Sequence, residues 1–236
     1  MHNNQEKLLI QENEYSIPYH WMRGRNLGKL YDLRTDIALR LSGNLEDKTV
    51  LDYGCGDGKF TNTLVNAGAS EVFGIDISQN ALGFARKLVP SANFMVFQGE
   101  QIEFSDKYFD VIFSLDVIEH ISDNDRDRIL TELIRILKPG GKLVLTVPSI
   151  NKNLDAKHFR HFIPGELIDK LKDKFSNFEI QGYFSKPHFL PVMLFDTLYN
   201  RRFIWKLFSA LIRLCDAGDA LYFALSCDKN KDNSIL

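Results

Sequence analysis

Glycine recurs at every second position after a short apolar run that contains an acid. The run covers residues 49–53, and the positions able to bear chemistry are Asp52, Gly54, Gly56 and Gly58. An apolar run that leads into clustered glycines is typical of a buried strand entering a tight turn. Glycine tolerates positive φ angles and a closely approaching ligand. A helix over 58–67 would present free N–H groups there, which suits an anionic group.

A second acid closes the next apolar run. Asp76 ends the run 71–76 and lies about 20 residues beyond the glycines, the offset expected of an acid that binds ribose hydroxyls. A carboxylate accepts two hydrogen bonds at once, so it suits a cis-diol. The glycine spacing departs from the dinucleotide fingerprint G-x-G-x-x-G, because Lys59 occupies the position of its last glycine.

Strand and helix patterns alternate along the chain. We expect strands at 49–53, 71–76, 93–97, 109–115 and 142–147, helices at 27–41, 58–67, 79–88 and 124–137, and further strands near 178–184 and 219–226. This alternation predicts an α/β fold in which a doubly wound parallel sheet carries helices on both faces. Ligands of such sheets bind outside the carboxyl ends of the strands, where the glycine turn and Asp76 both fall.

Further motifs occur in register with the glycine turn. They are the polar turn 99–101, the strand exit L-D-V-I-E-H at 115–120 and the run L-K-P-G-G at 137–141. Together with D-x-G-x-G-x-G, their order resembles the class I S-adenosylmethionine-dependent methyltransferases. The run H-F-R-H-F-I-P-G-E-L at 158–167 is similar to the branch that contains the ubiquinone-biosynthesis O-methyltransferases.

The resemblance implies a fold and a division of the chain. It implies a mostly parallel seven-stranded sheet with an antiparallel last strand, a helical N-terminal lid and a helical insertion before that strand. We expect one methyltransferase domain over 1–236, with the lid at 1–45, the cofactor-binding core at 46–150, and an acceptor-side half at 151–236 that holds the insertion, 190–216. Tyr19, His20 and Trp21 would line the pocket under the lid or pack the lid onto the core.

The same resemblance implies S-adenosylmethionine as the cofactor and names its contacts. By their place in the motifs, the cofactor-binding residues are Asp52, Gly54, Cys55, Gly56, Gly58, Asp76, Ile77, Glu100, Gln101, Leu115 and Asp116. Glu100 or Gln101 would meet the adenine amino group, at a position where the family often has aspartate.

Methyl transfer from a sulfonium is an in-line displacement, so the main task of the protein is orientation. A hydroxyl or amine acceptor must also lose a proton, which calls for a base. His120 is the first candidate because it follows the fourth strand, and His158 and His161 are the next candidates, with His20 behind them. Each of these histidines also has a purely structural interpretation, such as a backbone hydrogen bond.

A metal interpretation uses the same turn. Asp116, Glu119 and His120 would suit Mg²⁺ or Mn²⁺, which orient an acceptor in some relatives. Many relatives carry similar residues without a metal. We therefore assign no residue as a metal ligand.

The composition indicates which kind of acceptor the protein binds and in which cellular compartment it is expected. A net charge of −2 gives no broad basic field for nucleic acid, so we expect a small-molecule acceptor and no nucleic acid. The cysteines are Cys55, Cys215 and Cys227, without a C-x-x-C pair, which indicates neither disulfides nor zinc. The polar first 30 residues lack a signal-peptide core, so we expect a cytoplasmic protein.

The segment 190–216 is apolar apart from one polar stripe. Arg202, Lys206, Ser209, Arg213 and Asp216 form that stripe at helical spacing. Charge interrupts the segment too often for a membrane span. It fits a helix half buried on the domain or in a homodimer interface, or a helix at a membrane surface beside a lipophilic acceptor.

The acceptor atom is most consistent with oxygen. The N-P-P-[YW] motif of many amine-directed enzymes is absent after the fourth strand, where the chain reads Leu115-Asp116-Val117-Ile118. A carbon acceptor, as in the methylation of a quinone ring or a fatty-acyl chain, also remains open. Two other functions remain open as well: a catalytically silent methyltransferase-like scaffold, and a nicotinamide-dependent oxidoreductase, which the glycine spacing and L-K-P-G-G disfavour.

Overall fold

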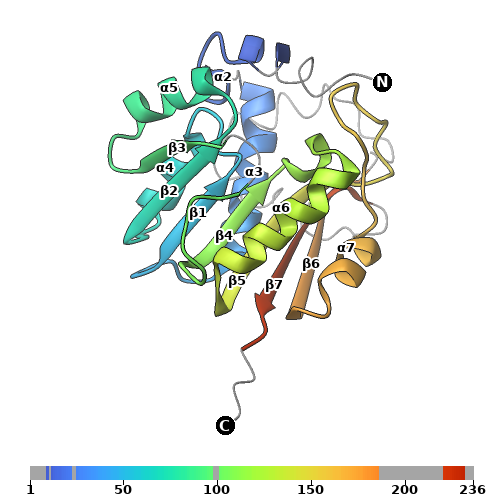
Figure 1. The fold of residues 1–236 in the computed structure, drawn as a ribbon. Coiled ribbons are helices and arrows are strands. Elements are labelled where there is room, and N and C mark those ends of the chain that lie inside the picture. Colours follow the sequence, from blue (N-terminus) through green and yellow to red (C-terminus); the bar gives the residue numbers. More distant parts are fainter. Residues whose placement is uncertain (1–8, 11, 23–24, 98–100, 186–219, 232–236) are drawn as a thin grey trace, which may run out of the picture.

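A seven-stranded sheet forms the centre of the molecule (Figure 1). The computed structural model describes residues 9–10, 12–22, 25–97, 101–185 and 220–231. The strands, in the spatial order β3-β2-β1-β4-β5-β7-β6, are β1 (Thr49–Tyr53), β2 (Glu71–Asp76), β3 (Asn93–Val96), β4 (Phe109–Leu115), β5 (Leu137–Pro148), β6 (Phe175–Ser185) and β7 (Ala220–Lys229). Only β7 runs antiparallel to its neighbours. The predicted doubly wound sheet with an antiparallel last strand is confirmed.

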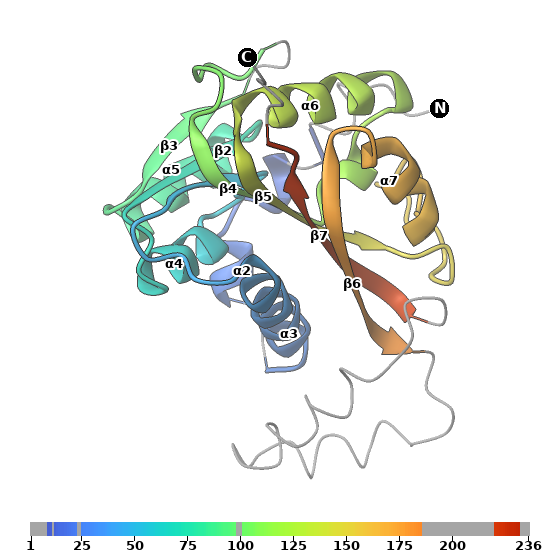
Figure 2. The same cartoon turned by 90° about the horizontal axis from the view of Figure 1, so that it is seen from below.

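Helices α3 (Arg25–Ser42), α4 (Lys59–Asn66), α5 (Gln79–Leu88) and α6 (Asp123–Ile136) fall close to the predicted ranges. The structure adds α2 (Tyr19–Met22), α7 (Pro164–Leu171) and a short 3₁₀ helix, η1 (Ile118–His120), which were not predicted. α6 and α7 cover one face of the sheet, and α3 and α4 cover the other (Figure 2). The expected helix at 190–216 lies outside the described residues.

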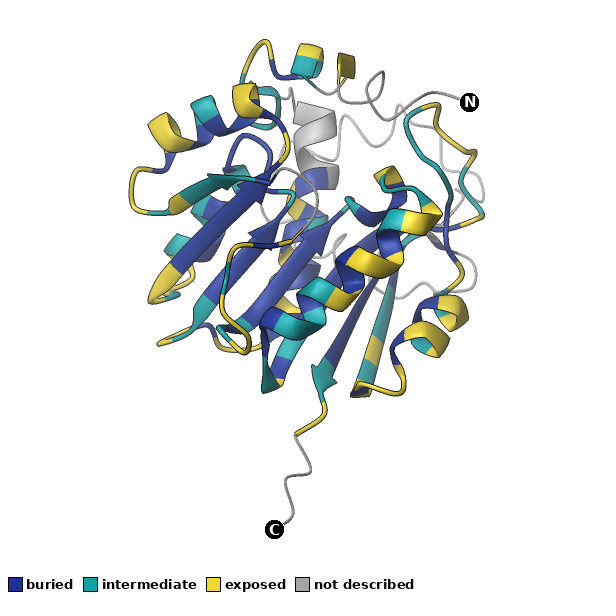
Figure 3. Ribbon diagram, in the orientation of Figure 1, coloured by how far each residue is buried: buried dark blue, intermediate teal, exposed yellow. Residues whose placement is uncertain are grey.

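Successive side chains of the strands pack into two apolar layers, one on each face of the sheet. Val50 belongs to the apolar layer that includes residues of α3 and α4, whereas its neighbour Leu51 belongs to the layer that includes residues of α6 and α7. Val111 and Ile112 divide in the same way on β4. Successive side chains of a strand point to opposite faces, so a sheet that is covered on both sides needs continuous apolar runs. Figure 3 shows the result, with buried strands between helices whose outer faces are exposed.

β5 begins earlier than the sequence pattern indicates. The sequence predicts a helix to residue 137 and a strand at 142–147, with the L-K-P-G-G run between them, but the strand starts at Leu137. Leu137 pairs with Phe109, and Lys142 pairs with Val111, so residues 138–141 form an irregularity in the ladder. Gly140 lies inside it with φ 75°. The glycines thus serve a bulge within the strand, a use that glycine often has in sheets.

No helix within the described part of the chain is long and apolar enough to cross a membrane.

Candidate active site

A cavity of 1240 Å³ opens at the carboxyl ends of the central strands. Gly54 follows β1, Asp76 ends β2 and Leu115 ends β4, and all three residues line it. Pockets for one small ligand commonly measure about 300–1000 Å³. This cavity therefore has room for two bound molecules side by side.

The glycine turn forms one wall of the cavity and requires glycine. Gly54 and Gly56 have φ angles of 77° and 54°, a region that other residues rarely adopt. A Cβ atom on Gly54 would lie 2.4 Å from Cγ2 of Val117, and one on Gly56 would lie 2.4 Å from the hydroxyl oxygen of Tyr15. The backbone N–H of Gly54 donates to the carbonyl of Ile75 at 2.8 Å, which fixes the turn against β2.

Two buried carboxyl groups support this turn. Asp76 accepts hydrogen bonds from the backbone N–H groups of Gly56 (2.8 Å) and Ser78 (2.9 Å). Burial outweighs these bonds and raises the pKa of Asp76 to about 6. Asp52 accepts a hydrogen bond from Oγ1 of Thr61 at 2.7 Å, and burial raises its pKa to about 7. Asp52 thereby ties β1 to α4.

The N-terminal segment 12–22 lies across the glycine turn. The backbone N–H of His20 donates to Oδ2 of Asp57 at 2.7 Å, and Nε1 of Trp21 donates to the Asp57 carbonyl at 2.9 Å. Further back, Glu12 accepts hydrogen bonds from Oγ of Ser78 (3.0 Å) and the backbone N–H of Gln79 (2.9 Å). The segment is therefore attached both to the turn and to the N-terminus of α5.

Asp116 also lines the cavity, and its backbone is in a strained conformation. Its φ angle is 53°, and its carboxylate pairs with the guanidinium of Arg34 and accepts a hydrogen bond from Oγ1 of Thr146 at 2.7 Å. Arg34 lies on α3 and also stacks on the ring of Tyr31 at 4.8 Å. This ion pair joins α3 to the end of β4.

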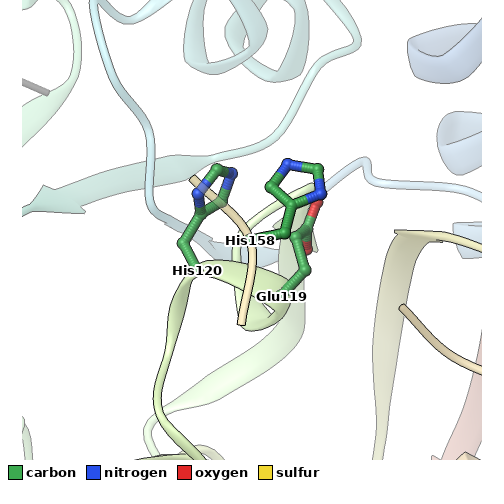
Figure 4. Close-up of side chains that lie close together, drawn as sticks. All are labelled: Glu119, His120 and His158. Atoms are coloured by element: carbon green, nitrogen blue, oxygen red, sulfur yellow. The ribbon is translucent and has the colours of Figure 1, made fainter. Parts of the chain in front are cut away.

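Of the candidate bases, His20, His120 and His158 line the cavity, and His161 lies beside His158. His161 itself is not among the lining residues. The rings of His120 and His158 meet edge to face with their centroids 4.6 Å apart. Figure 4 shows both rings above η1, which also carries Glu119. The loop that bears His158 is held there because the backbone N–H of Phe159 donates to the Glu119 carbonyl at 2.7 Å.

Burial keeps these histidines neutral near pH 7. It lowers the pKa of His158 to about 4, with nearby His120 as the next cause. Burial also lowers the pKa values of His120 and His161, against a backbone hydrogen bond in each case. Neutral imidazole has a lone pair that accepts a proton, so this wall of the cavity can supply a base.

Residues 51–145 match a family model described as "Methyltransferase domain". This part of the chain is a class I methyltransferase domain. Domains of this class use S-adenosylmethionine, and the site fits that molecule. Gly54, where the Val117 side chain leaves no room for a Cβ atom, brings bare backbone to the cavity, and the carboxyl group of Asp76 is buried at the end of β2.

Curated relatives share the methyltransferase domain and part of the remaining chain. The protein is 29% identical over 146 residues to a ubiquinone biosynthesis O-methyltransferase of Nitrosomonas europaea, and the alignment covers 58% of this chain and 60% of the relative. It is 30% identical over 136 residues to phosphoethanolamine N-methyltransferase 2 of Caenorhabditis elegans, and that alignment covers 55% of this chain and 31% of the relative. The chain therefore spans less than two thirds of the length of these relatives.

Solved structures share the fold over most of the chain. The N-methyltransferase NodS from Bradyrhizobium japonicum, solved with S-adenosyl-L-homocysteine, aligns with a TM-score of 0.65 at 17% identity, covering 95% of this chain and 98% of that one. The [4+2]-cyclase SpnF aligns with a TM-score of 0.62 at 20% identity, covering 86% and 83%. At these identities the likeness shows the fold alone.

The predicted cofactor residues fall into three groups: those that line the cavity, those that form the glycine turn, and those placed at 100–101. Those that line the cavity are Asp52, Gly54, Cys55, Asp76, Ile77, Leu115 and Asp116. Gly56 and Gly58 are not lining residues but belong to the turn itself, and Gly58 also caps α4. Gln101 is exposed and does not line the cavity, and Glu100 lies outside the described residues.

The structure divides the two expected roles among the aromatic residues of α2. Tyr19 and His20 line the cavity, whereas Trp21 packs the N-terminal segment onto the core, with its indole Nε1 donating to the Asp57 carbonyl. Arg34 was missed, since an arginine on an amphipathic helix carries no sequence signal for a distant partner. Glu12 was missed for the same reason.

One group of side chains within the described ranges has the donors for a metal ion. The ligand atoms of Glu119, His120 and His158 lie within 4.8 Å of one another. Asp116, which the sequence places with this group, is engaged by Arg34 and Thr146 instead. Burial and nearby Asp116 raise the pKa of Glu119, which favours a neutral carboxyl group and weakens it as a ligand.

Proposed function

We propose that this protein transfers the methyl group of S-adenosylmethionine to a hydroxyl oxygen of a small-molecule acceptor. One observation carries the proposal: Gly54 and Asp76 line the same cavity as His120 and His158. That is the arrangement required by a displacement in which donor and acceptor are held in line while the acceptor loses a proton.

The residues that line the cavity have different roles in the proposed reaction. Asp76 would accept hydrogen bonds from the ribose hydroxyls, and the backbone of the glycine turn would lie against the cofactor. Bound S-adenosylmethionine supplies an electrophilic methyl group with a neutral leaving group. Orientation in such a site contributes several kcal/mol, within the roughly 7–11 kcal/mol possible. A neutral histidine adds general base catalysis.

The N-terminal segment 12–22 would cover the bound cofactor as a lid. The hydrogen bonds from His20 and Trp21 to Asp57, and from α5 to Glu12, support this role. The acceptor would then lie against the aromatic wall that includes the stacked rings of Tyr183 and Tyr222, whose centroids are 5.6 Å apart.

An oxygen acceptor of lipophilic character is favoured. The ubiquinone biosynthesis relatives and a tocopherol O-methyltransferase of Arabidopsis thaliana, 32% identical over 131 residues, are named for oxygen methylation. The apolar segment 190–216 agrees with a lipid-linked acceptor, peripheral membrane contact or a homodimer. The net charge of −2 argues against nucleic acid.

An amine acceptor is the second candidate. The phosphoethanolamine N-methyltransferases of Caenorhabditis elegans and Plasmodium falciparum match this chain at 30% and 28% identity. Their names favour nitrogen over oxygen, and the histidine wall would deprotonate an ammonium group equally well.

A methyl-label partition tests both candidates. The purified protein is incubated with methyl-labelled S-adenosylmethionine and a cell extract, and the products are separated into organic, aqueous and macromolecular fractions. We expect label in the organic fraction. Re-extraction at acidic and alkaline pH separates the acceptor atoms, because a methylated amine changes phase with its charge and a methyl ether does not.

The other outcomes would overturn parts of the proposal. Label in the aqueous fraction would exclude a lipophilic acceptor, and label on macromolecules would exclude a small molecule. An absence of label in every fraction, with S-adenosylhomocysteine still bound, would favour a silent scaffold. Binding of NADH without binding of S-adenosylhomocysteine would favour an oxidoreductase.

A further inference from the structure

His158, His161 and a backbone carbonyl form a continuous chain of hydrogen bonds. Nδ1 of His158 lies 2.7 Å from Nε2 of His161, and Nδ1 of His161 lies 3.0 Å from the carbonyl oxygen of Lys152. The ring planes of the two histidines are 60° apart. His161 is 7% exposed, and it stands between the loop backbone and His158.

The carbonyl at the end of the chain decides where each proton lies. A carbonyl oxygen only accepts hydrogen bonds, so Nδ1 of His161 must carry a proton. In a neutral imidazole the second nitrogen is then an acceptor, so Nε2 of His161 has a lone pair. Nδ1 of His158 must therefore be the donor of the 2.7 Å hydrogen bond. Burial, which keeps both rings neutral, is consistent with this assignment.

We infer that His161 is a positioning residue that holds His158 in the Nδ1–H tautomer, so that Nε2 of His158 carries the basic lone pair at the cavity wall. The ring of His120 packs edge to face on the ring of His158, with the two centroids 4.6 Å apart, and so limits rotation of the His158 ring. The role of a second group that sets a histidine tautomer is a general one. Here a neutral histidine and a main-chain carbonyl would fill it.

The inferred step rests on the proposed function. The acceptor O–H bond breaks and an N–H bond forms at Nε2 of His158, while the oxygen takes the methyl group as the methyl–sulfur bond breaks and a thioether remains. The positive charge of the sulfonium thus ends on the His158 imidazolium. Nδ1–H of His158 continues to donate to His161, whose lone pair stabilises that charge. The proton leaves to water after release of the products.

The tautomer is directly measurable without acceptor or cofactor. Long-range ¹H–¹⁵N correlation spectra of the full chain at pH 7 distinguish a protonated from an unprotonated ring nitrogen, and the spectrum of His158→Asn assigns the His158 signals. We expect Nδ1 protonated and Nε2 unprotonated. A protonated Nε2 on neutral His158, or a charged His161, would overturn the inference even in an active enzyme. Correct tautomers in an enzyme that transfers no methyl group would overturn only the proposed function.

Paired substitutions test the role of His161. His161→Gln retains one acceptor and one donor, so we expect it to keep the tautomer and most of kcat. His161→Leu removes both, and we expect mixed His158 tautomers and a fall in kcat of about tenfold or more with little change in KM, within the range of general base catalysis. His20→Asn is the matched control, because His20 lies in the same cavity but bonds to Asp57, and it should leave the His158 tautomer unchanged. Equal kcat values for the Gln and Leu variants would contradict the positioning role.

Discussion

Asp76→Ala offers the sharpest test of the cofactor site. The carboxyl group of Asp76 is 4% exposed and accepts hydrogen bonds from Gly56 and Ser78, so its position is fixed before any ligand binds. A cofactor ribose at the end of β2 would add hydrogen bonds to the same carboxylate. The substitution removes those bonds and also releases the backbone N–H of Gly56 at the floor of the turn.

The expected loss can be estimated from these contacts. Hydrogen bonds to a charged group contribute about 1.5–3 kcal/mol, and about 1.4 kcal/mol corresponds to tenfold in Kd. The Kd for S-adenosylhomocysteine should therefore rise roughly 10- to 150-fold. We place the result in the upper part of this range, because the turn loses an anchor at the same time. Isothermal titration calorimetry measures the change directly.

Asp110→Ala provides a matched control for this measurement. Asp110 also accepts from a backbone N–H, that of Thr49 at 2.9 Å, and from Nζ of Lys138 at 2.8 Å. It lies on β4 but does not line the cavity. Its loss should lower the melting temperature without changing Kd. An unchanged Kd for Asp76→Ala, or an equal loss in both variants, would show that the ribose does not bind at the end of β2.

Three further predictions follow from the same geometry. Gly54→Ala should abolish S-adenosylhomocysteine binding, because it adds a 2.4 Å clash with Val117 to the strain of φ 77°. The control Gly68→Ala, with φ 89° and nothing within 4 Å of its Cβ, should lose only about 1–2 kcal/mol of stability and retain binding. Calorimetry and thermal melts compare the two variants, and binding by Gly54→Ala would contradict the requirement for glycine in the turn. The affinity for S-adenosylhomocysteine should weaken as the pH falls below 6, where the raised pKa of Asp76 lets its carboxylate take up a proton and lose acceptor capacity; titrations between pH 5 and 8 should show this dependence in the wild type and lack it in Asp76→Ala. Treatment with a chelator should leave methyl transfer unchanged, since Arg34 engages Asp116 and burial favours a neutral Glu119; a loss of activity that Mg²⁺ restores would instead establish a metal site.

The position of the cofactor site follows from the residue pattern alone. The glycine turn and Asp76 could be predicted because both depend on local properties: a positive φ angle that favours glycine, and the end of an apolar strand. The continuous apolar runs likewise predicted a sheet covered on both faces, since Val50 and Leu51 are both needed inside. These features are set by neighbours in the chain, so the residue pattern is enough to locate them.

The contacts between side chains of distant segments around the cavity could not be predicted from the residue pattern. Arg34 reaches Asp116 from another element, Trp21 turns to Asp57 rather than to the cavity, and His161 lies behind His158. The bulge at 138–141 also appears only once β5 pairs with β4. Each of these depends on the direction of a side chain or on strand register, which packing between distant segments fixes. The motifs therefore predicted His120, His158 and His161 near the site, and the fold separated His120 and His158, which line the cavity, from His161, which lies behind His158.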